Sequence, residues 1–247
     1  MIVTLPMYDR AETHAAHDRF WDLMRAHLPG APEALTRDGL HWADPDLLLS
    51  QTCSLPYRTG LQDCVSIVAT PVHDLACPAG YYFSVIVVRA DDTRTALSDF
   101  AGARIAINSP LSQSGWAAID ALAQEAGITF DVATETGAHQ ASARAVAEGR
   151  ADICALDAVS WTMIRRWDGF AEGLRVLTET PPTPALPYIT AMGRDARPLQ
   201  EALVTAVDAL SPDDREALCL IDVTHISADR YAHMPIPPAP VLTPEPL

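Results

Sequence analysis

The chain has 247 residues, of which 49% are hydrophobic, and a formal net charge of −15 at pH 7. This apolar content can fill the core of one large domain or two small lobes, and the acidic balance disfavours nucleic acid as a partner. All 17 basic residues are arginine; the lack of lysine excludes Walker A loops, Schiff-base chemistry and protein kinases.

The first third of the chain combines short apolar runs with one amphipathic stretch. A helix is predicted over 12–28, with Phe20 on its apolar face. His14 and His17 could share one face of this helix, but a solvated surface is the preferred interpretation. Strands are predicted at 2–8, 46–52, 65–72 and 81–90.

The middle of the chain repeats a strand-then-helix pattern three times. Gly127 and Gly149 mark two of the helix ends. The first unit is a strand at 103–108 followed by a helix that ends at 127. The second is a strand at 130–136 followed by a helix at 139–148, and the third is a strand at 151–157 followed by a helix at 158–167. This alternation is typical of α/β folds with mostly parallel sheets. After a strand at 174–180, helices are predicted at 196–209 and 212–220, and the proline-rich tail 234–247 is expected to be extended.

Polar residues follow each of these three strands. Because right-handed crossovers bring the carboxyl ends of parallel strands to one edge, we expect them to converge there. They are Asn108, Ser109, Ser112, Gln113, Ser114, Gly115, His139 and Asp157. Hydroxyls and N–H groups at a helix start bind oxyanions, and Gly115 would let an anion approach the backbone. Because no basic residue occurs between Arg104 and Arg144, such an anion would be held by dipoles and hydroxyls.

Each of these residues also has a purely structural interpretation. Ser112 or Ser114 is suited to cap the following helix, and so is Asp157. Asp157 could instead accept a hydrogen bond from a ligand amine or hydroxyl, or orient His139. His139 by itself is compatible with a surface or capping role, and Tyr82 with a place in the core.

Other functional signals are few. The chain has no HExxH motif, no paired CxxC and no acidic calcium loop, so no metal or cofactor is predicted. Five widely spaced cysteines exclude a full disulfide framework; free thiols are expected, with a Cys53–Cys77 pair as the alternative. No apolar run approaches the roughly 18 residues of a membrane span. Without a signal-peptide pattern the expected location is cytoplasmic, or periplasmic if Met1 replaces a removed leader.

Four segments together resemble a known family: "GYYFSVIVV", "LSDFAGARIAINSPLSQSGW", "TGAHQASARAVAEGRADICALDAVSW" and "LRVLTETPPTPALPYI". They are similar to the phosphate/phosphite/phosphonate-binding proteins of ABC importers, over most of the chain except its first 45 residues and its tail. The resemblance implies a two-lobed type II periplasmic-binding-protein fold, with a mostly parallel sheet in each lobe and crossing strands near 77–84 and 181–190. Lobe 1 would comprise 1–78 with 188–247, and lobe 2 would comprise 79–187.

The resemblance also implies a ligand site. It assigns the oxyanion loop to Ser112, Gln113 and Ser114, an anion contact to His139, an aromatic contact at the hinge to Tyr82, and an acidic contact to Asp157. Lobe 1 would contribute Gln51, Thr52 and, from its place at the end of the first strand, Tyr8. Gln113 stands where the family more often has a hydroxyl residue.

The function so implied is that of a monomeric solute-binding protein without catalytic residues. It would capture a small anion such as a phosphonate, phosphate or phosphite in a cleft between its lobes and deliver it to an ABC permease. Two alternatives are a cytoplasmic enzyme on the same fold, with His139 and Asp157 as acid and base, and a ligand sensor.

Overall fold

The computed structural model describes residues 1–131 and 133–242 and consists of two compact units. Unit 1 contains Met1–Tyr81 and Pro184–Met234, and unit 2 contains Tyr82–Thr183 and the described chain from Pro235. The chain passes between the units at Tyr81/Tyr82, at Thr183/Pro184 and after Met234. The first two passages lie in the short paired strands β4 (Tyr81–Tyr82) and β10 (Thr183–Pro184).

Unit 1 is built on a five-stranded mixed sheet of order β1-β2-β11-β3-β12. Its strands are β1 (Ile2–Val3), β2 (Leu47–Gln51), β3 (Val65–His73), β11 (Tyr188–Ala191) and β12 (Leu220–Thr224). The β1/β2 pair is parallel, whereas the β2/β11, β11/β3 and β3/β12 pairs are antiparallel. The expected mostly parallel arrangement does not hold here. The strand β11, which enters the sheet directly after the chain returns from unit 2, runs against β2 and β3, and β12 runs against β3.

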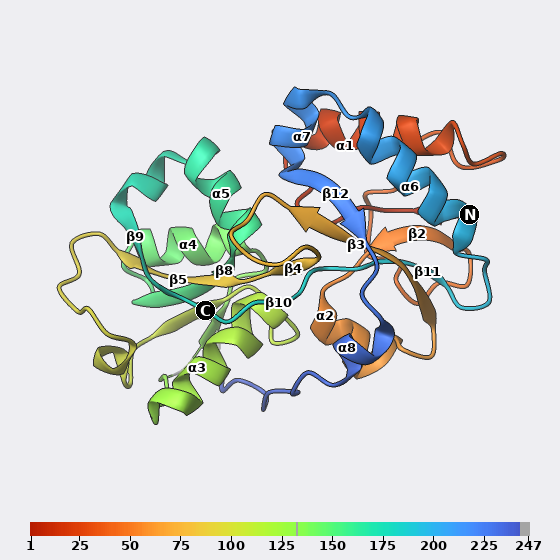
Figure 1. Ribbon diagram of the computed structural model, residues 1–247. Coiled ribbons are helices and arrows are strands. Elements are labelled where there is room, and N and C mark those ends of the chain that lie inside the picture. The colour runs from red at the N-terminus through yellow and green to blue at the C-terminus, as the bar shows by residue number, and fades with distance from the viewer. Residues whose placement is uncertain (132, 243–247) are drawn as a thin grey trace. The chain divides into compact units, whose positions relative to one another are not determined.

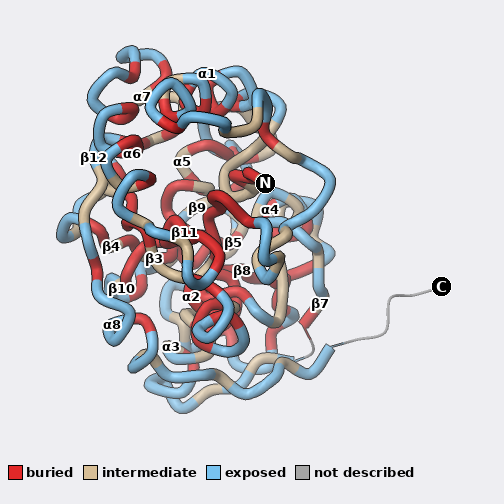
Figure 2. Tube along the Cα trace, turned by 90° about the vertical axis from the view of Figure 1, so that its right-hand side faces the viewer, coloured by how far each residue is buried: buried red, intermediate tan, exposed pale blue. Residues whose placement is uncertain are grey.

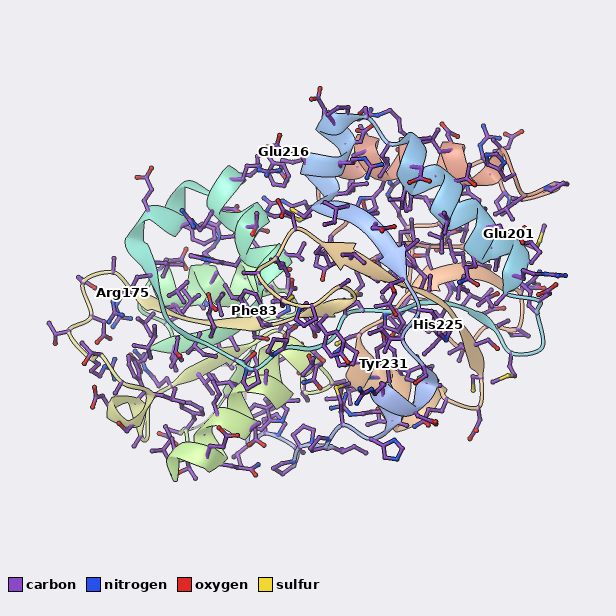
Figure 3. All side chains as sticks on the ribbon, viewed as in Figure 1. Phe83, Arg175, Glu201, Glu216, His225 and Tyr231 are labelled. Carbon is purple, nitrogen blue, oxygen red and sulfur yellow. The ribbon has the colours of Figure 1, made fainter. Side chains whose placement is uncertain are left out.

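Helices cover both faces of this sheet (Figure 1). One face packs against α1 (His14–Arg25), α6 (Arg197–Ala209) and α7 (Pro212–Leu218), and the other packs against α2 (Ser54–Pro56), the π-helical turn η1 (Tyr57–Leu61) and α8 (Ala228–Ala232). Tyr231 of α8, labelled in Figure 3, is fully buried, and its hydroxyl donates to the carbonyl of Ala185 at 2.8 Å and lies 2.8 Å from Thr70 Oγ1. Each face thus has its own apolar core.

Unit 2 is built on a second mixed sheet of order β7-β6-β8-β5-β9. Its strands are β5 (Ser84–Arg89), β6 (Ile105–Ile107), β7 (Ala133–Glu135), β8 (Ile153–Asp157) and β9 (Leu174–Glu179). The neighbours β7, β6 and β8 are parallel, as predicted, and β5 is antiparallel to β8 and β9. Burying one aliphatic side chain contributes about 1.5–3 kcal/mol, and β5 is buried from Ser84 to Val88, so this strand contributes strongly to stability.

The helices of unit 2 also cover both faces of its sheet (Figure 1). One face packs against α4 (His139–Ala147) and α5 (Ala158–Trp167). The other face packs against the π-helical turn η3 (Gln113–Ala117) and α3 (Ala118–Ala126). Short 3-10 turns lie at Leu97–Phe100 and Gly169–Gly173. Figure 2 shows buried residues concentrated along the strands and exposed residues along the outer turns.

Several predicted boundaries were wrong. The strand predicted at 2–8 ends at Val3, because Pro6 lacks an N–H group and Tyr8 adopts a positive φ of 66°. The helix predicted at 212–220 ends at Leu218, since Cys219 is left-handed (φ 50°), and the chain continues as the unpredicted strand β12. The strand predicted at 81–90 is divided between β4 and β5. Val132, within the strand predicted at 130–136, and residues 243–247 lie outside the described residues.

The described part of the tail is extended, as predicted, but it groups with unit 2 rather than with residues 188–234. The indole N–H of Trp116 donates to the carbonyl of Pro238 at 2.8 Å. The Ala133 N–H donates to the carbonyl of Val241 at 2.9 Å. These hydrogen bonds explain why this segment does not belong to the lobe that the sequence assigned.

Candidate functional site

The carboxyl ends of β6, β7 and β8 lie at one edge of the unit 2 sheet, because these strands are parallel. Each strand leads through its loop to the N-terminus of a helix: β6 to η3 and α3, β7 to α4, and β8 to α5. The predicted residues Ser112, Gln113, Ser114, His139 and Asp157 occupy these three starts. The N–H groups of a first helical turn have no partner within the helix and carry partial positive charge, so this edge favours an anion.

Three of these side chains form a contiguous polar cluster, which we call the Ser114–His139–Asp157 cluster. Ser114 Oγ lies 3.0 Å from His139 Nε2, and Asp157 Oδ2 lies 3.4 Å from the same nitrogen. Ser114 is 3% exposed, and the side chains of His139 and Asp157 are 13% and 4% exposed. Residues from three strand–helix units are thus brought together as the sequence predicted.

His139 is held close to its neutral form. Burial lowers the pKa of its imidazole below the ordinary value, while the Asp157 carboxylate and the backbone of Ala155 act in the opposite direction. Its place as the first residue of α4 adds to the effect of burial, because the positive end of the helix dipole disfavours an imidazolium. A neutral imidazole protonated at Nε2 can still donate one hydrogen bond to a carboxylate or to an oxyanion.

Ser112 and Asp157 both act as helix caps, as their structural interpretation predicted. Ser112 Oγ accepts from the N–H of Gly115 at 2.9 Å, and Asp157 Oδ1 accepts from the N–H of Ser160 at 2.8 Å. Asp157 Oδ2 also accepts from Ser160 Oγ at 2.6 Å. By contrast, no side chain among the described residues caps α4. Ser114 makes no cap and contacts His139 instead.

Gly115 has a role that differs from the predicted one. A Cβ atom at this position would lie 1.9 Å from Asn108 Oδ1 and 3.2 Å from Ser112 Oγ. The glycine therefore admits the Asn108 side chain, and the space proposed for an anion at its backbone is filled by that amide. Asn108 Oδ1 is buried, and within residues 1–131 and 133–242 it has no hydrogen-bond donor.

Of the unit 1 residues that the resemblance implied, Gln51 and Thr52 lie at the end of β2, whereas Tyr8 lies in a turn five residues after the end of β1. Gln51 ends β2, and its Nε2 donates to the carbonyl of Leu186 at 3.1 Å; Thr52 is fully buried, with its hydroxyl 3.2 Å from the carbonyl of Cys53. Tyr8 lies edge-on to His73, with ring centroids 5.5 Å apart. Tyr8 and Gln51 line a narrow pocket, whereas Thr52 does not. The other lining residues are Leu5, His17, Phe20, His73, Tyr188, Leu218 and Leu220.

Two polar residues of unit 1 were not recognised in the sequence. His17, predicted to be solvated, is 6% exposed, because α1 packs this face on the sheet; its Nδ1 lies 3.2 Å from the carbonyl of Thr13. Burial lowers the pKa of its imidazole, and Asp9 opposes that shift. Arg58 in η1 is 5% exposed, with Nη1 at 3.4 Å from Ser54 Oγ. For Arg58, the signal available in the sequence was a single charged residue within the mainly uncharged segment "LPYRTGL".

Tyr82, the remaining predicted site residue, is 1% exposed and begins unit 2 directly after the first passage of the chain. All five cysteines are free, including Cys53 and Cys77. The described residues contain no group of three or more His, Cys, Asp or Glu side chains arranged for a metal ion. In the same part of the chain, no helix has the length and apolarity needed to cross a membrane.

Comparison with known proteins identifies the family of this chain. A family model described as "ABC transporter, phosphonate, periplasmic substrate-binding protein" matches residues 49–230. No curated protein matches the chain.

Among solved structures, the chain is similar to PhnD1 from Prochlorococcus marinus in complex with methylphosphonate. The identity is 15%, the TM-score is 0.70, and 93% of this chain and 94% of that chain are covered. It is also similar to a binding protein component of an ABC phosphonate transporter from Pseudomonas aeruginosa (12% identity, TM-score 0.75, coverage 94% and 82%). XAC2383 from Xanthomonas citri bound to ATP shares 16% identity at a TM-score of 0.68, with coverage of 93% and 92%. At these identities the likeness concerns the fold.

Proposed function

Since the chain belongs to the family of periplasmic substrate-binding proteins of phosphonate ABC transporters, we propose that the carboxyl edge of its unit 2 sheet binds the oxyanion group of the transported solute. Ser112, Gln113 and Ser114 supply the loop at the start of η3, and His139 supplies a ring N–H. Tyr82 and Asp157 in unit 2, and Tyr8, Gln51 and Thr52 in unit 1, complete the proposed ligand set.

The observation that carries this proposal is the Ser114–His139–Asp157 cluster at the starts of three helices. Its hydroxyl and imidazole lie 3.0 Å apart and are largely buried. Donors that are fixed by the fold and shielded from water bind an oxyanion more strongly than the same donors in solvent. The bound methylphosphonate of the Prochlorococcus protein makes a small phosphonate the first ligand to test.

The geometry of the cluster favours binding over catalysis. In a nucleophilic triad, the histidine contacts the nucleophile through one ring nitrogen and the carboxylate through the other. Here Ser114 Oγ and Asp157 Oδ2 both approach Nε2. Asp157 is therefore not placed to orient the imidazole from its far side, and we assign no catalytic role to these residues.

The partners follow from the family. An ABC permease receives the ligand, the periplasm is the proposed compartment, and the proposed state is a monomer. No cofactor is assigned.

A thermal-shift panel tests the proposed function. Methylphosphonate, phosphate, phosphite, methanesulfonate and ATP are added in turn to the intact chain. A ligand at 100 times its Kd should stabilise the protein by about 2.7 kcal/mol. If no oxyanion raises the Tm, the proposed function is wrong.

Substitutions then locate the site. Ser114→Ala should weaken binding of the responding anion by about 10- to 100-fold, because one charge-assisted hydrogen bond contributes about 1.5–3 kcal/mol. The S114A/H139A double variant should bind still more weakly. The matched control is S98A, which alters an exposed serine of the same unit and should bind as the wild type does. Unchanged affinity of the double variant would place the site elsewhere.

A further inference from the structure

The edge of the unit 2 sheet that is formed by β9 borders a groove that the proposed oxyanion site does not use. In the order of this sheet β9 comes last, with β5 beside it (Figure 1). The groove has a volume of about 610 Å³ and is lined by residues of α5, of the turn at Gly169–Gly173 and of the start of β9. We call it the β9 groove, and its lining includes Trp161, Arg165, Arg166, Trp167, Leu174 and Val176.

The backbone of β9 presents hydrogen-bonding groups along its outer edge. Its residues Leu174–Glu179 pair with β5 on one side. In an antiparallel pair only alternate residues direct their N–H and C=O groups at the partner strand, so the others direct theirs outward. The N–H of Leu174 donates to the carbonyl of Ala171; beyond it, no other backbone segment of the described chain bonds to this edge. Such an edge can be extended by a strand from another chain.

The groove offers a place for an apolar side chain of such a strand. Trp161 and Leu174 form buried parts of its lining, with exposures of 7% and 8%. Val176 lies two residues after Leu174, on the same face of β9, and is 37% exposed. Tryptophan and arginine are enriched at the centres of protein–protein interfaces, where they contribute most of the binding energy. The composition of the β9 groove is therefore that of a docking surface.

The charge of the groove is opposite to that of the whole chain. The chain has a net charge of −15, yet three of the five charged residues that line the groove are arginine. Arg165 is exposed and has no ion-pair partner within the described chain, and the guanidinium carbon of Arg166 lies 5.2 Å from the centre of the Trp167 ring. Of the two carboxylates, Asp168 accepts from Gln140 Nε2 at 2.5 Å. An acidic partner is attracted to this groove, whereas a predominantly acidic surface repels it.

We propose that the β9 groove binds an extended acidic segment of a partner protein. The segment adds one strand to the edge of β9, seats an aromatic or aliphatic side chain beside Trp161, and places carboxylates near Arg165 and Arg166. Hydrogen bonds between the two backbones supply affinity, and the groove supplies the preference for sequence. This surface lies within unit 2 and extends the protein's interactions beyond capture of a solute.

A synthetic peptide tests the proposed docking by fluorescence anisotropy with the intact chain. The probe is a fluorescein-labelled peptide of alternating glutamate and valine with one central phenylalanine. Two control peptides have lysine in place of glutamate, or proline in place of two valines. Each should bind at least about tenfold more weakly than the acidic peptide, because the first reverses the charge and the second lacks N–H groups for strand pairing.

Hydrogen exchange tests the addition of a strand directly. When the acidic peptide saturates the protein, the outward amides within Leu174–Glu179 should exchange at least about tenfold more slowly, since new hydrogen bonds protect them. A small molecule that occupied only the groove would leave these amides unchanged.

A charge-reversal variant locates the binding surface. R165E/R166E should weaken binding of the acidic peptide about tenfold, because each reversal removes an attraction and adds a repulsion. The matched control is R25E/R150E, which changes the net charge equally at exposed arginines outside the groove and should weaken binding much less. A circular dichroism melt checks that both variants fold.

Several outcomes would overturn the inference. They are no binding of the acidic peptide, equal binding of either control peptide, unchanged amide exchange in β9, and equal affinities of the two folded variants. None of them affects the proposed oxyanion function, because the β9 groove shares no residue with the Ser114–His139–Asp157 cluster.

Discussion

His139 illustrates how burial and neighbouring groups act on the pKa of one side chain. Its side chain is 13% exposed, at the first position of α4, and touches a hydroxyl and a carboxylate through one nitrogen. Burial and the helix start keep the imidazole neutral, and the carboxylate of Asp157 partly compensates. Protonation of a histidine in this environment lowers the stability of the folded protein. Protonation of an exposed histidine does not.

The pH dependence of stability tests this environment. Burial lowers the folded-state pKa of His139 below its ordinary value of 6.5. As the pH falls through that value, the unfolded chain binds a proton that the folded chain does not, so stability falls. His139→Gln should therefore lose less Tm than the wild type between about pH 7.5 and about pH 5.5.

Two further variants serve as references in these thermal melts. H225Q alters an exposed histidine and should keep the wild-type loss of Tm. H17Q should behave as H139Q does, since burial also lowers the pKa of His17. If H139Q loses as much Tm as the wild type over this pH range, the assignment of His139 as a buried, neutral side chain is wrong.

At the scale of elements, the site depends on three helix starts with different caps. Ser112 caps η3, Asp157 caps α5, and no side chain in the described chain caps α4. The turn η3 is π-helical before it continues as the regular helix α3. Such turns are rare and frequently occur at functional sites. Ser112 thus fixes the start of the turn that contains Gln113 and Ser114 of the proposed ligand set.

A pair of capping variants separates folding from binding. Ser112→Ala and Ser211→Ala each remove an N-cap hydrogen bond, to the N–H of Gly115 at 2.9 Å and of Asp214 at 3.1 Å. Each should lower the free energy of unfolding by about 1 kcal/mol, measured by urea denaturation. Only S112A should also weaken anion binding in titration calorimetry, because α7, which Ser211 caps, belongs to unit 1. Equal affinities would show that Ser112 acts on stability alone.

At the scale of the whole molecule, the tail follows unit 1 in the chain but groups with unit 2. Unit 1 ends at Met234, yet Pro238 and Val241 accept hydrogen bonds from Trp116 and Ala133 of unit 2. Trp116 is 8% exposed and packs in the same core as Ile107 and Ile119. The tail therefore adds to the stability of the unit that carries the proposed oxyanion site.

Removal of the tail tests this attachment. A chain ending at Met234 should lose about 2–3 kcal/mol of stability, since each lost hydrogen bond contributes about 0.5–1.5 kcal/mol and some apolar cover is lost as well. This corresponds to a fall in Tm of about 4–12 °C for a chain of this size. Trp116 fluorescence should shift to longer wavelength as its indole meets water. An unchanged Tm would mean that these contacts are energetically neutral.

The local pattern of the sequence determined the middle of the chain and the convergence of the site. Strands β6, β7 and β8 with their helices follow from apolar periodicity and terminal glycines, and parallel strands with right-handed crossovers bring Ser114, His139 and Asp157 to one edge. These features were predictable because they depend on residues close together in sequence and on a general rule of handedness.

Only the tertiary structure decided the remaining features, because each depends on a distant partner. Strand β12 forms by pairing with β3 after Cys219 turns left-handed, and His17 is buried because α1 packs on the unit 1 sheet. Gly115 is required by the side chain of Asn108, and the tail is held by Trp116. Side-chain contacts between segments that are far apart in sequence leave no periodic signal, so composition and spacing could not reveal them.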